Sequence, residues 1–133
     1  MIIKLNKQDF TKGQVLAPNW YKASICKFEA KKPKAGGDSI NYFFTFKLET
    51  PDLDEVRTTF NTQFLLPFTE LVAALEGRNR KDLIKELEDG TLDFDTDECI
   101  GTKLQVKIEN GTYEGKLQNE IKAYLPYDAA VPF

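Results

Sequence analysis

The chain of 133 residues has no histidine and only two cysteines, Cys26 and Cys99, far apart in the sequence. Histidine is the commonest general base and a frequent zinc ligand, and a zinc site needs several such ligands close together. Two isolated cysteines predict reduced, mostly buried thiols. These absences favour a protein that is not an enzyme and that binds no metal and no cofactor.

Long apolar runs are also missing. No stretch approaches the ~20 apolar residues that span a bilayer. Residues 1–7, Met-Ile-Ile-Lys-Leu-Asn-Lys, lack the long apolar segment of a secretory signal. We therefore expect a cytoplasmic protein with no membrane partner.

The common phosphate and calcium motifs are absent as well. The sequence has no glycine-rich phosphate-binding loop and no nucleophile–base spacing. The acidic segment 93–98 resembles the start of a calcium loop, which needs glycine at its sixth position and glutamate at its twelfth. Those positions hold Glu98 and Leu104. We interpret the segment as a solvated connector, with the weaker alternative that its carboxylates compete with DNA or receive a basic partner.

The net charge of −3 is unevenly placed along the chain. Residues 1–50 carry nine Lys or Arg against four Asp or Glu, residues 51–100 carry five against thirteen, and residues 101–133 carry four of each. An acidic total permits a basic face, because binding of a polyanion depends on where the cations lie. The first 50 residues are the place to look for such a face.

Five segments show the alternation of apolar and polar residues that is typical of β-strands. Their ranges are 20–30, 39–48, 56–63, 102–109 and 117–125. In the second segment one face is entirely apolar and is predicted to be core; its residues are Ile40, Tyr42, Phe44, Phe46 and Leu48. Each segment is bounded by turn residues such as proline, glycine, asparagine or aspartate.

Regular alternation assigns faces in the first and last strands too. In the first strand it places Ile25 inside and Phe28 outside. In the last strand it places Leu125 inside, and Lys122 and Tyr124 outside. The full inward sets are Tyr21, Ala23 and Ile25 in the first strand, and Asn119, Ile121, Ala123 and Leu125 in the last.

Two helical patterns lie between the third and fourth strands. The first has apolar residues at helical spacing, with Pro67 near its start and Gly77 at its end. The second begins after a predicted N-cap, Asn79, and ends at Gly90. Both helices have an apolar stripe to bury, which favours a helical cover at one end of a barrel over a helix-turn-helix reader.

Three strands, a helical insert and two further strands are the order of an OB-fold, a five-stranded Greek-key barrel. We predict an N-terminal arm over residues 1–19, an OB-fold domain over 20–125 and a C-terminal tail over 126–133. A β-sandwich or another α+β roll is compatible with the same strand count. OB-folds bind oligonucleotides or oligosaccharides on their second and third strands and the flanking loops.

Residues 31–48 combine positive charge with aromatic rings. The loop holds Lys31, Lys32 and Lys34, and the following strand places Phe43 and Lys47 on the face opposite the core. Proteins that hold single-stranded nucleic acid use cations for phosphates and flat rings for bases, and stacking contributes ~1–3 kcal/mol per base. The same residue types at these positions predict a ligand face.

Four residues elsewhere in the chain extend this predicted face. Arg57 lies on the neighbouring strand, Lys22 and Lys122 lie on the first and last strands, and Tyr113 lies near the tip of the last hairpin. The alternative interpretation is that Phe43 packs under the N-terminal arm and that the lysines serve only solubility.

Several motifs resemble a phage- and prophage-encoded family, long described only as a domain of unknown function, whose members are thought to bind single-stranded DNA. The similar segments are Leu16-Ala17-Pro18-Asn19-Trp20-Tyr21-Lys22-Ala23, the Lys/Gly loop, and the hairpin Tyr113-x-Gly115…Asn119-x-Ile121. The resemblance covers most of the chain, although each motif is short and degenerate. It implies a role in phage DNA replication or recombination, in the cytoplasm of the host cell.

The C-terminal end resembles a second group. Bacterial single-stranded DNA-binding proteins end in an acidic tail tipped Asp-Ile-Pro-Phe, which docks replication and repair proteins. This chain ends Val131-Pro132-Phe133, but only Asp128 is charged near the tip. The resemblance implies that Pro132 and Phe133 bind a replication or recombination protein.

The sequence therefore supports two hypotheses for function. In the first, the chain is a non-catalytic single-stranded DNA-binding protein with little sequence preference. In the second, it is a protein-interaction or virion-associated module, and its basic face is incidental. The oligomeric state, including a homo-oligomer, stays open.

Overall fold

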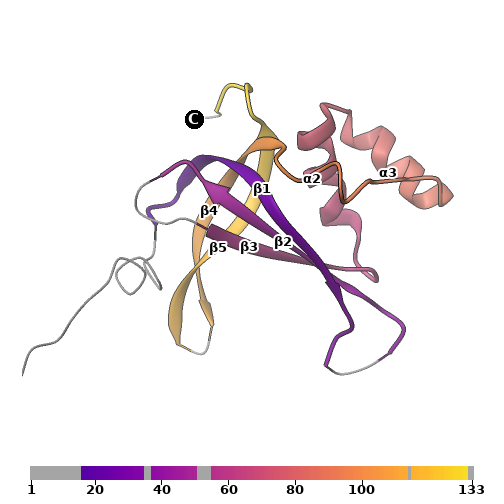
Figure 1. Cartoon of the computed structure of the whole chain (residues 1–133), viewed down its shortest axis with the longest axis horizontal. Coiled ribbons are helices and arrows are strands. Elements are labelled where there is room, and N and C mark those ends of the chain that lie inside the picture. The colour runs from indigo at the N-terminus through magenta and orange to yellow at the C-terminus, as the bar shows by residue number, and fades with distance from the viewer. Residues whose placement is uncertain (1–15, 35–36, 51–54, 114, 132–133) are drawn as a thin grey trace, which may run out of the picture.

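A computed structural model describes residues 16–34, 37–50, 55–113 and 115–131 of the chain. Five strands and two helices follow one another in the predicted order (Figure 1). Their bounds are β1 Asn19–Lys31, β2 Asn41–Leu48, β3 Glu55–Asn61, α2 Leu66–Glu76, α3 Arg80–Asp89, β4 Lys103–Tyr113 and β5 Lys116–Pro126. The strands form one antiparallel sheet in the order β3-β2-β1-β4-β5.

The inner face of the sheet holds the core, and β2 contributes its largest side chains. Phe44 and Phe46 are fully buried, as the alternation predicts. The ring of Phe44 stacks on Phe68 of α2 at 5.9 Å and lies 5.9 Å from Phe60 of β3. These ring contacts join the sheet to the first helix, because Phe44 touches both elements.

Strand β1 contains a β-bulge that the sequence did not reveal. Ile25 pairs with Phe46 and Lys27 pairs with Thr45, so Cys26 is an extra residue without a partner on β2. An extra residue reverses the alternation of all side chains beyond it. Phe28 therefore turns inward, and its ring lies 5.0 Å from Phe44. The prediction that Phe28 lies on the other face is wrong for this reason.

A second bulge in β5 corrects the prediction for the last strand. Lys107 of β4 pairs with Ala123, and the next residue, Ile108, pairs with Ile121, which leaves Lys122 as the extra residue. Beyond it the faces exchange. Tyr124, predicted to point outward, is buried and lies 6.0 Å from Phe46 and 6.4 Å from Phe60 between ring centroids. Leu125, predicted to point inward, faces the opposite side.

The edges of the sheet are β3 and β5. Tyr124 lies between them, because its ring packs on Phe60 of β3 while its backbone N–H donates to a carboxylate oxygen of Glu70 in α2 at 3.4 Å. Burial raises the pKa of the Tyr124 hydroxyl, which is hydrogen-bonded to Thr58. Side chains thus connect the two edge strands within the described residues.

The helices begin and end where the sequence predicts. Pro67 lies in the first turn of α2, and Gly77 follows its last residue in the left-handed conformation. The Asn79 side chain accepts a hydrogen bond from Lys81 N–H at 2.8 Å and caps α3, and Gly90 ends that helix. The sequence preferences of helix ends therefore account for the residues at both ends of each helix.

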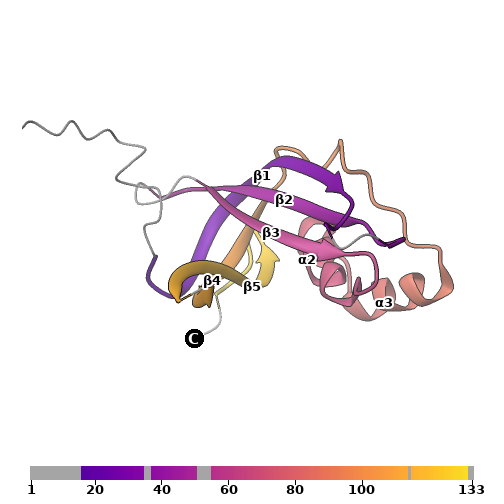
Figure 2. The ribbon, with the colours of Figure 1, turned by 90° about the horizontal axis from the view of Figure 1, so that it is seen from below.

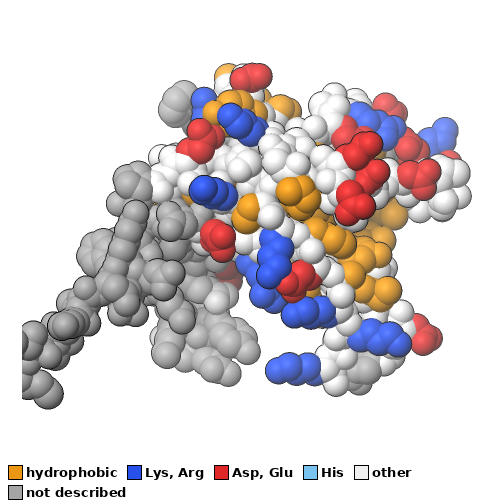
Figure 3. Space-filling model, viewed as in Figure 1, with side chains coloured by type: hydrophobic (Ala, Val, Ile, Leu, Met, Phe, Trp, Pro, Cys, Tyr) orange, Lys and Arg blue, Asp and Glu red, His pale blue; other side chains and the backbone are white. Residues whose placement is uncertain are grey.

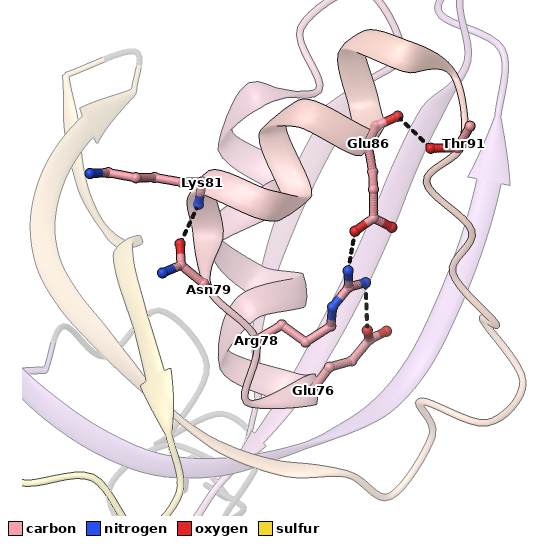
Figure 4. A network of polar contacts seen from close by, with 6 residues as sticks. All are labelled: Glu76, Arg78, Asn79, Lys81, Glu86 and Thr91. Atoms are coloured by element: carbon pink, nitrogen blue, oxygen red, sulfur yellow. Dashed lines mark hydrogen bonds and ion pairs between the residues drawn. The ribbon is translucent and has the colours of Figure 1, made fainter.

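An arginine links the two helices. Arg78, between α2 and α3, is paired with Glu86 of α3 and, at 3.6 Å, with Glu76 of α2 (Figure 4). Thr91 donates to the carbonyl oxygen of Glu86 at 3.4 Å. The pair of helices lies at one end of the curved sheet rather than across its outer face (Figure 2), as expected for an end cover.

The described end of the predicted arm packs on the domain. Leu16 is buried in the core, and its N–H donates to the Asn119 side chain at 2.9 Å. The helices among the described residues are too short or too polar to cross a membrane.

The bulge in β5 makes a prediction about stability. Tyr124→Ala should lower the free energy of unfolding by roughly 3–5 kcal/mol, because it removes a buried ring from the contact between β3 and β5. Denaturant unfolding followed by tryptophan fluorescence measures the loss.

The matched control is Leu125→Ala, which truncates the adjacent, partly exposed side chain on the other face. We expect a loss of at most about 1.5 kcal/mol there. A larger loss for Leu125 than for Tyr124 would mean that β5 has regular alternation and no bulge.

Candidate nucleic-acid interface

The outer face of β2 and β3, opposite the core, carries a stacked pair of flat side chains. The Arg57 guanidinium carbon lies 4.2 Å from the centroid of the Phe43 ring. Phe43 is half-buried and Arg57 is exposed. The register of β2 and β3 brings these two side chains together. Phe43 is opposite Thr59, and Arg57 is opposite Thr45, so Phe43 and Arg57 are diagonal neighbours on the same face of the sheet. Lys47, two positions beyond Thr45, is exposed on the same face.

Strand β1 adds two lysines and a glutamate to this outer face. Lys27 is opposite Thr45, Glu29 is opposite Phe43, and Lys31 is opposite Asn41. Glu29 accepts from Lys27 at 2.6 Å and from Lys31 at 3.1 Å. The hydrogen bond from Lys27, then that from Lys31, lowers the pKa of Glu29 to about 2. The carboxylate therefore holds both ammonium groups beside the stacked pair.

We call this set the β1–β3 outer patch; it consists of Lys27, Glu29, Lys31, Phe43, Lys47, Glu55 and Arg57. Four of these residues are cationic and two are anionic, so the patch has a net charge of +2 while the whole chain has −3. Figure 3 shows Lys and Arg side chains spread over this side of the molecule, with acidic side chains between them. Three of the nine cations in residues 1–50, namely Lys27, Lys31 and Lys47, thus lie on one face together with Arg57.

Cys26, the bulged residue of β1, lies beside this patch. Its thiol donates to the Thr45 carbonyl oxygen at 3.4 Å. Burial, followed by the charge of Glu55, raises the pKa of the Cys26 thiol, which keeps it protonated and a weak nucleophile. Cys99 is buried as predicted, whereas Cys26 is exposed, so the expectation of buried thiols is wrong for Cys26.

Lys22 lies on the outer face of β1 but contacts a different group. Its ammonium nitrogen is 4.8 Å from the centroid of the Tyr127 ring, and that of Lys103 is 5.3 Å from the same centroid. Tyr127 also donates to Glu49 at 3.3 Å. The chain after β5 therefore folds over the outer face at the opposite end of β1 from Lys31.

Gln105 anchors that C-terminal segment. Its side-chain amide donates to the backbone oxygens of Pro126, Tyr127 and Ala129 at 3.1, 3.3 and 2.8 Å. Gln105 is buried although it is polar, because these three carbonyl groups satisfy its donors. The first residues of the predicted tail are thus a fixed part of the domain.

The remaining predicted site residues are scattered. Lys32 and Lys34 are exposed in the loop between β1 and β2. Lys122, the bulged residue of β5, pairs with Glu120 at 2.8 Å and lines a separate hollow with Thr59 and Asn61 of β3. Tyr113 ends β4, but its side chain, like Pro132 and Phe133, lies outside the described residues.

Several residues of the outer face were not among the predicted site residues, and two of them, Lys27 and Trp20, offer a cation and an aromatic ring. Lys27 was missed because regular alternation from Ile25 places it inside, and only the bulge at Cys26 turns it outward. Trp20 of β1, half-buried and opposite Lys107, provides a second aromatic ring on the outer face. The sequence contained a signal for this position, because Trp20 alternates with the inward residues Tyr21 and Ala23 and so falls on the outer face.

No protein-family model matches the chain, and no curated protein matches it. The function must therefore be argued from the chemistry of the site. Among the described residues, no three Cys, Asp or Glu side chains converge in a way that could hold a metal ion. The patch offers four cations, two carboxylates and one aromatic ring.

The pairing of Glu29 makes a prediction about pH. Its carboxyl carbon, followed by NMR, should titrate with a midpoint at about 2 rather than near the ordinary ~4.3. Because the folded pKa is lowered, the ionised form contributes stability that is present above the unfolded value and is lost as the pH falls toward the folded one.

Lys27→Gln should raise that midpoint, because it removes the stronger hydrogen bond to Glu29. Lys85→Gln, on α3, removes an equal charge that does not contact Glu29 and should leave the midpoint unchanged. A Glu29 midpoint near the ordinary value in the unaltered protein would show that the two lysines are not held by this carboxylate.

Proposed function

We propose that the protein binds single-stranded DNA without catalysis and with little sequence preference. The observation that carries the proposal is the β1–β3 outer patch, in which the guanidinium of Arg57 lies over the ring of Phe43 among three exposed lysines. Nonspecific single-strand binders need this combination of cations along a backbone path and flat surfaces for bases.

The stacked pair provides the surface for a base. The guanidinium of Arg57 is planar and covers one face of Phe43, and both groups stack on bases. A base that stacks on the exposed side of Arg57 extends the column to three layers. Every base has a flat face, so this contact does not distinguish between sequences.

The lysines provide the contacts to phosphate. Lys47 is exposed and forms no ion pair among the described residues, so its binding to a phosphate breaks no existing pair. Lys27 and Lys31 share Glu29, and two cations on one carboxylate leave a net positive charge. Phosphates release condensed counterions when these groups neutralise them, which drives association.

We propose further that the five-stranded sheet forms an OB-type barrel. In support, the pairing of β1 with both β2 and β4 and the helical insert between β3 and β4 suit that fold. The rings of Tyr124 and Phe60 bring the two edge strands into contact. The patch then occupies β2, β3 and the adjoining part of β1, where OB-folds bind oligonucleotides.

The resemblance to the phage family extends the proposal to the process in which the protein acts. The protein would cover displaced single strands during phage DNA replication or recombination, in the host cytoplasm. Lys32 and Lys34 would contact the strand from the β1–β2 loop, and Tyr113 from the last hairpin. Docking of a replication protein on Pro132 and Phe133 is part of the same proposal.

Removal of the stacked ring tests the base contact. Phe43→Ala removes the ring that supports Arg57 in the base contact. It should weaken binding of single-stranded oligonucleotides roughly 5- to 150-fold, up to the equivalent of one lost base stack, and by a similar factor for different sequences. Fluorescence anisotropy with labelled homopolymers measures it. Lys81→Gln, an exposed change on α3 away from the patch, is the matched control and should leave the affinity unchanged.

Equal affinity in the Phe43 variant and the unaltered protein would exclude this ring from the site. No binding of any single-stranded oligonucleotide at low salt would overturn the proposed function itself. In that case the protein-interaction hypothesis gains support.

The salt dependence tests the phosphate contacts. The logarithm of the binding constant should fall linearly with the logarithm of salt concentration, with a slope of about −0.7 for each phosphate contacted. Lys47→Gln should make the slope shallower by roughly 0.7, because one contact is lost. A slope that is unchanged while affinity falls would mean that Lys47 acts through the fold and not through a phosphate.

A further inference from the structure

The inner side of the β1–β2 hairpin borders a groove that the proposed function does not use. The groove has a volume of about 460 Å³, within the range of ~300–1,000 Å³ that is typical of ligand sites. Phe28, Ala30 and Tyr42 form its sheet side, and Leu92 and Phe94 form the opposite side. Figure 3 shows the corresponding patch of hydrophobic side chains between the end of the hairpin and the helices.

The apolar side chains of this groove are only partly covered. Phe28, Tyr42, Leu92 and Phe94 pack against the core but keep part of their surface exposed. These side chains therefore give the groove an apolar surface that a ligand can cover.

The charged residues that line the groove are acidic. Among the described residues, Asp93 is the only charged one in its lining, and a second hollow shares Asp93, Phe94 and Thr96 with it. That second hollow adds Glu76, Asp95 and Glu98, and no described lysine or arginine lines either hollow. An occupant must therefore be apolar at its centre and positive at its edge.

We propose that this groove binds a peptide segment of another protein, in which a bulky apolar side chain is flanked by Lys or Arg. The apolar side chain fills the space between Tyr42 and Phe94, and the flanking cations lie beside Asp93 and Glu98. Burial of apolar surface drives the association, while the carboxylates select the charge of the partner.

Nucleic acid fits this groove less well than a peptide does. Phosphates are repelled by Asp93 and by the carboxylates of the adjoining hollow. A base has polar edges that need hydrogen-bond partners, and among the described residues the groove offers only Asp93, Thr96 and the hydroxyl of Tyr42 as polar groups of side chains. The groove also lies on the inner side of β1 and β2, whereas Phe43 and Arg57 lie on the outer side. The two sites are therefore separable by mutation.

Selection from a random peptide library, with the full chain as bait, tests the proposal. We expect the enriched peptides to share a Leu, Ile, Phe or Trp flanked by Lys or Arg. Ala30→Trp fills the groove from an exposed position of β1 and should weaken binding of a synthesised consensus peptide by about tenfold or more, the scale of a lost hot-spot contact.

Charge reversal provides the second variant. Asp93→Lys combined with Glu98→Lys should weaken the same peptide to a similar extent and should reduce the salt sensitivity of its binding. Asp128→Lys makes the same kind of change at an exposed residue that lines neither hollow and should leave peptide affinity unchanged. Circular dichroism and thermal unfolding establish that each variant is folded.

Three results would overturn the proposal. The first is a selection without a consensus, or with an acidic one. The second is a consensus peptide that binds equally well to the Ala30→Trp variant. The third is a change in the Ala30→Trp variant that points to another occupant. Loss of oligonucleotide binding would mean that nucleic acid occupies the groove, and loss of concentration-dependent self-association in sedimentation would mean that a second copy of the chain does. If the groove variants still bind oligonucleotides, the groove and the outer patch are separate sites, and each proposal is tested on its own.

Discussion

Side chains along a β-strand alternate between two faces, and a bulge reverses that alternation for every residue beyond it. This constraint acts twice here, at Cys26 in β1 and at Lys122 in β5. The first bulge turns Phe28 into the core side and Lys27 out to the patch. The second turns Tyr124 inward, where it joins the two edge strands. Both the core and the candidate site depend on these two residues, neither of which has a partner on the adjacent strand.

The sequence predicted the elements well because their signals are local. Strand alternation, the proline and glycine that bound α2, and the Asn79 cap each involve a few neighbouring residues. Phe43, Lys47 and Arg57 were predicted to share one face and do so, because they lie on a regular strand and its neighbour. Prediction failed beyond each bulge, because the position of an extra residue is set by the partner strand and leaves no local pattern. The contact between Lys22 and Tyr127 could not be predicted either, since it depends on how the chain after β5 folds back.

The β1–β2 hairpin presents different chemistry on its two sides. Its outer side has cations around a stacked ring, and its inner side has an apolar groove bordered by carboxylates from the segment after α3. The uneven charge of the sequence is thereby separated in space, with the basic first part and the acidic middle part on opposite sides of one two-stranded element. A polyanion and a cationic peptide could occupy the two sides at once without competing for the same residues.

The exposed position of Cys26 has a practical consequence. The chain has two thiols, and only Cys26 is open to solvent, at a residue that lacks a cross-strand partner and lies next to Thr45 on the side of Arg57. A thiol-reactive fluorophore would attach there selectively, at mildly alkaline pH because the thiol pKa is raised. The natural sequence thus already contains a single labelling point beside the outer patch, from which binding events on that face can be followed without any added cysteine.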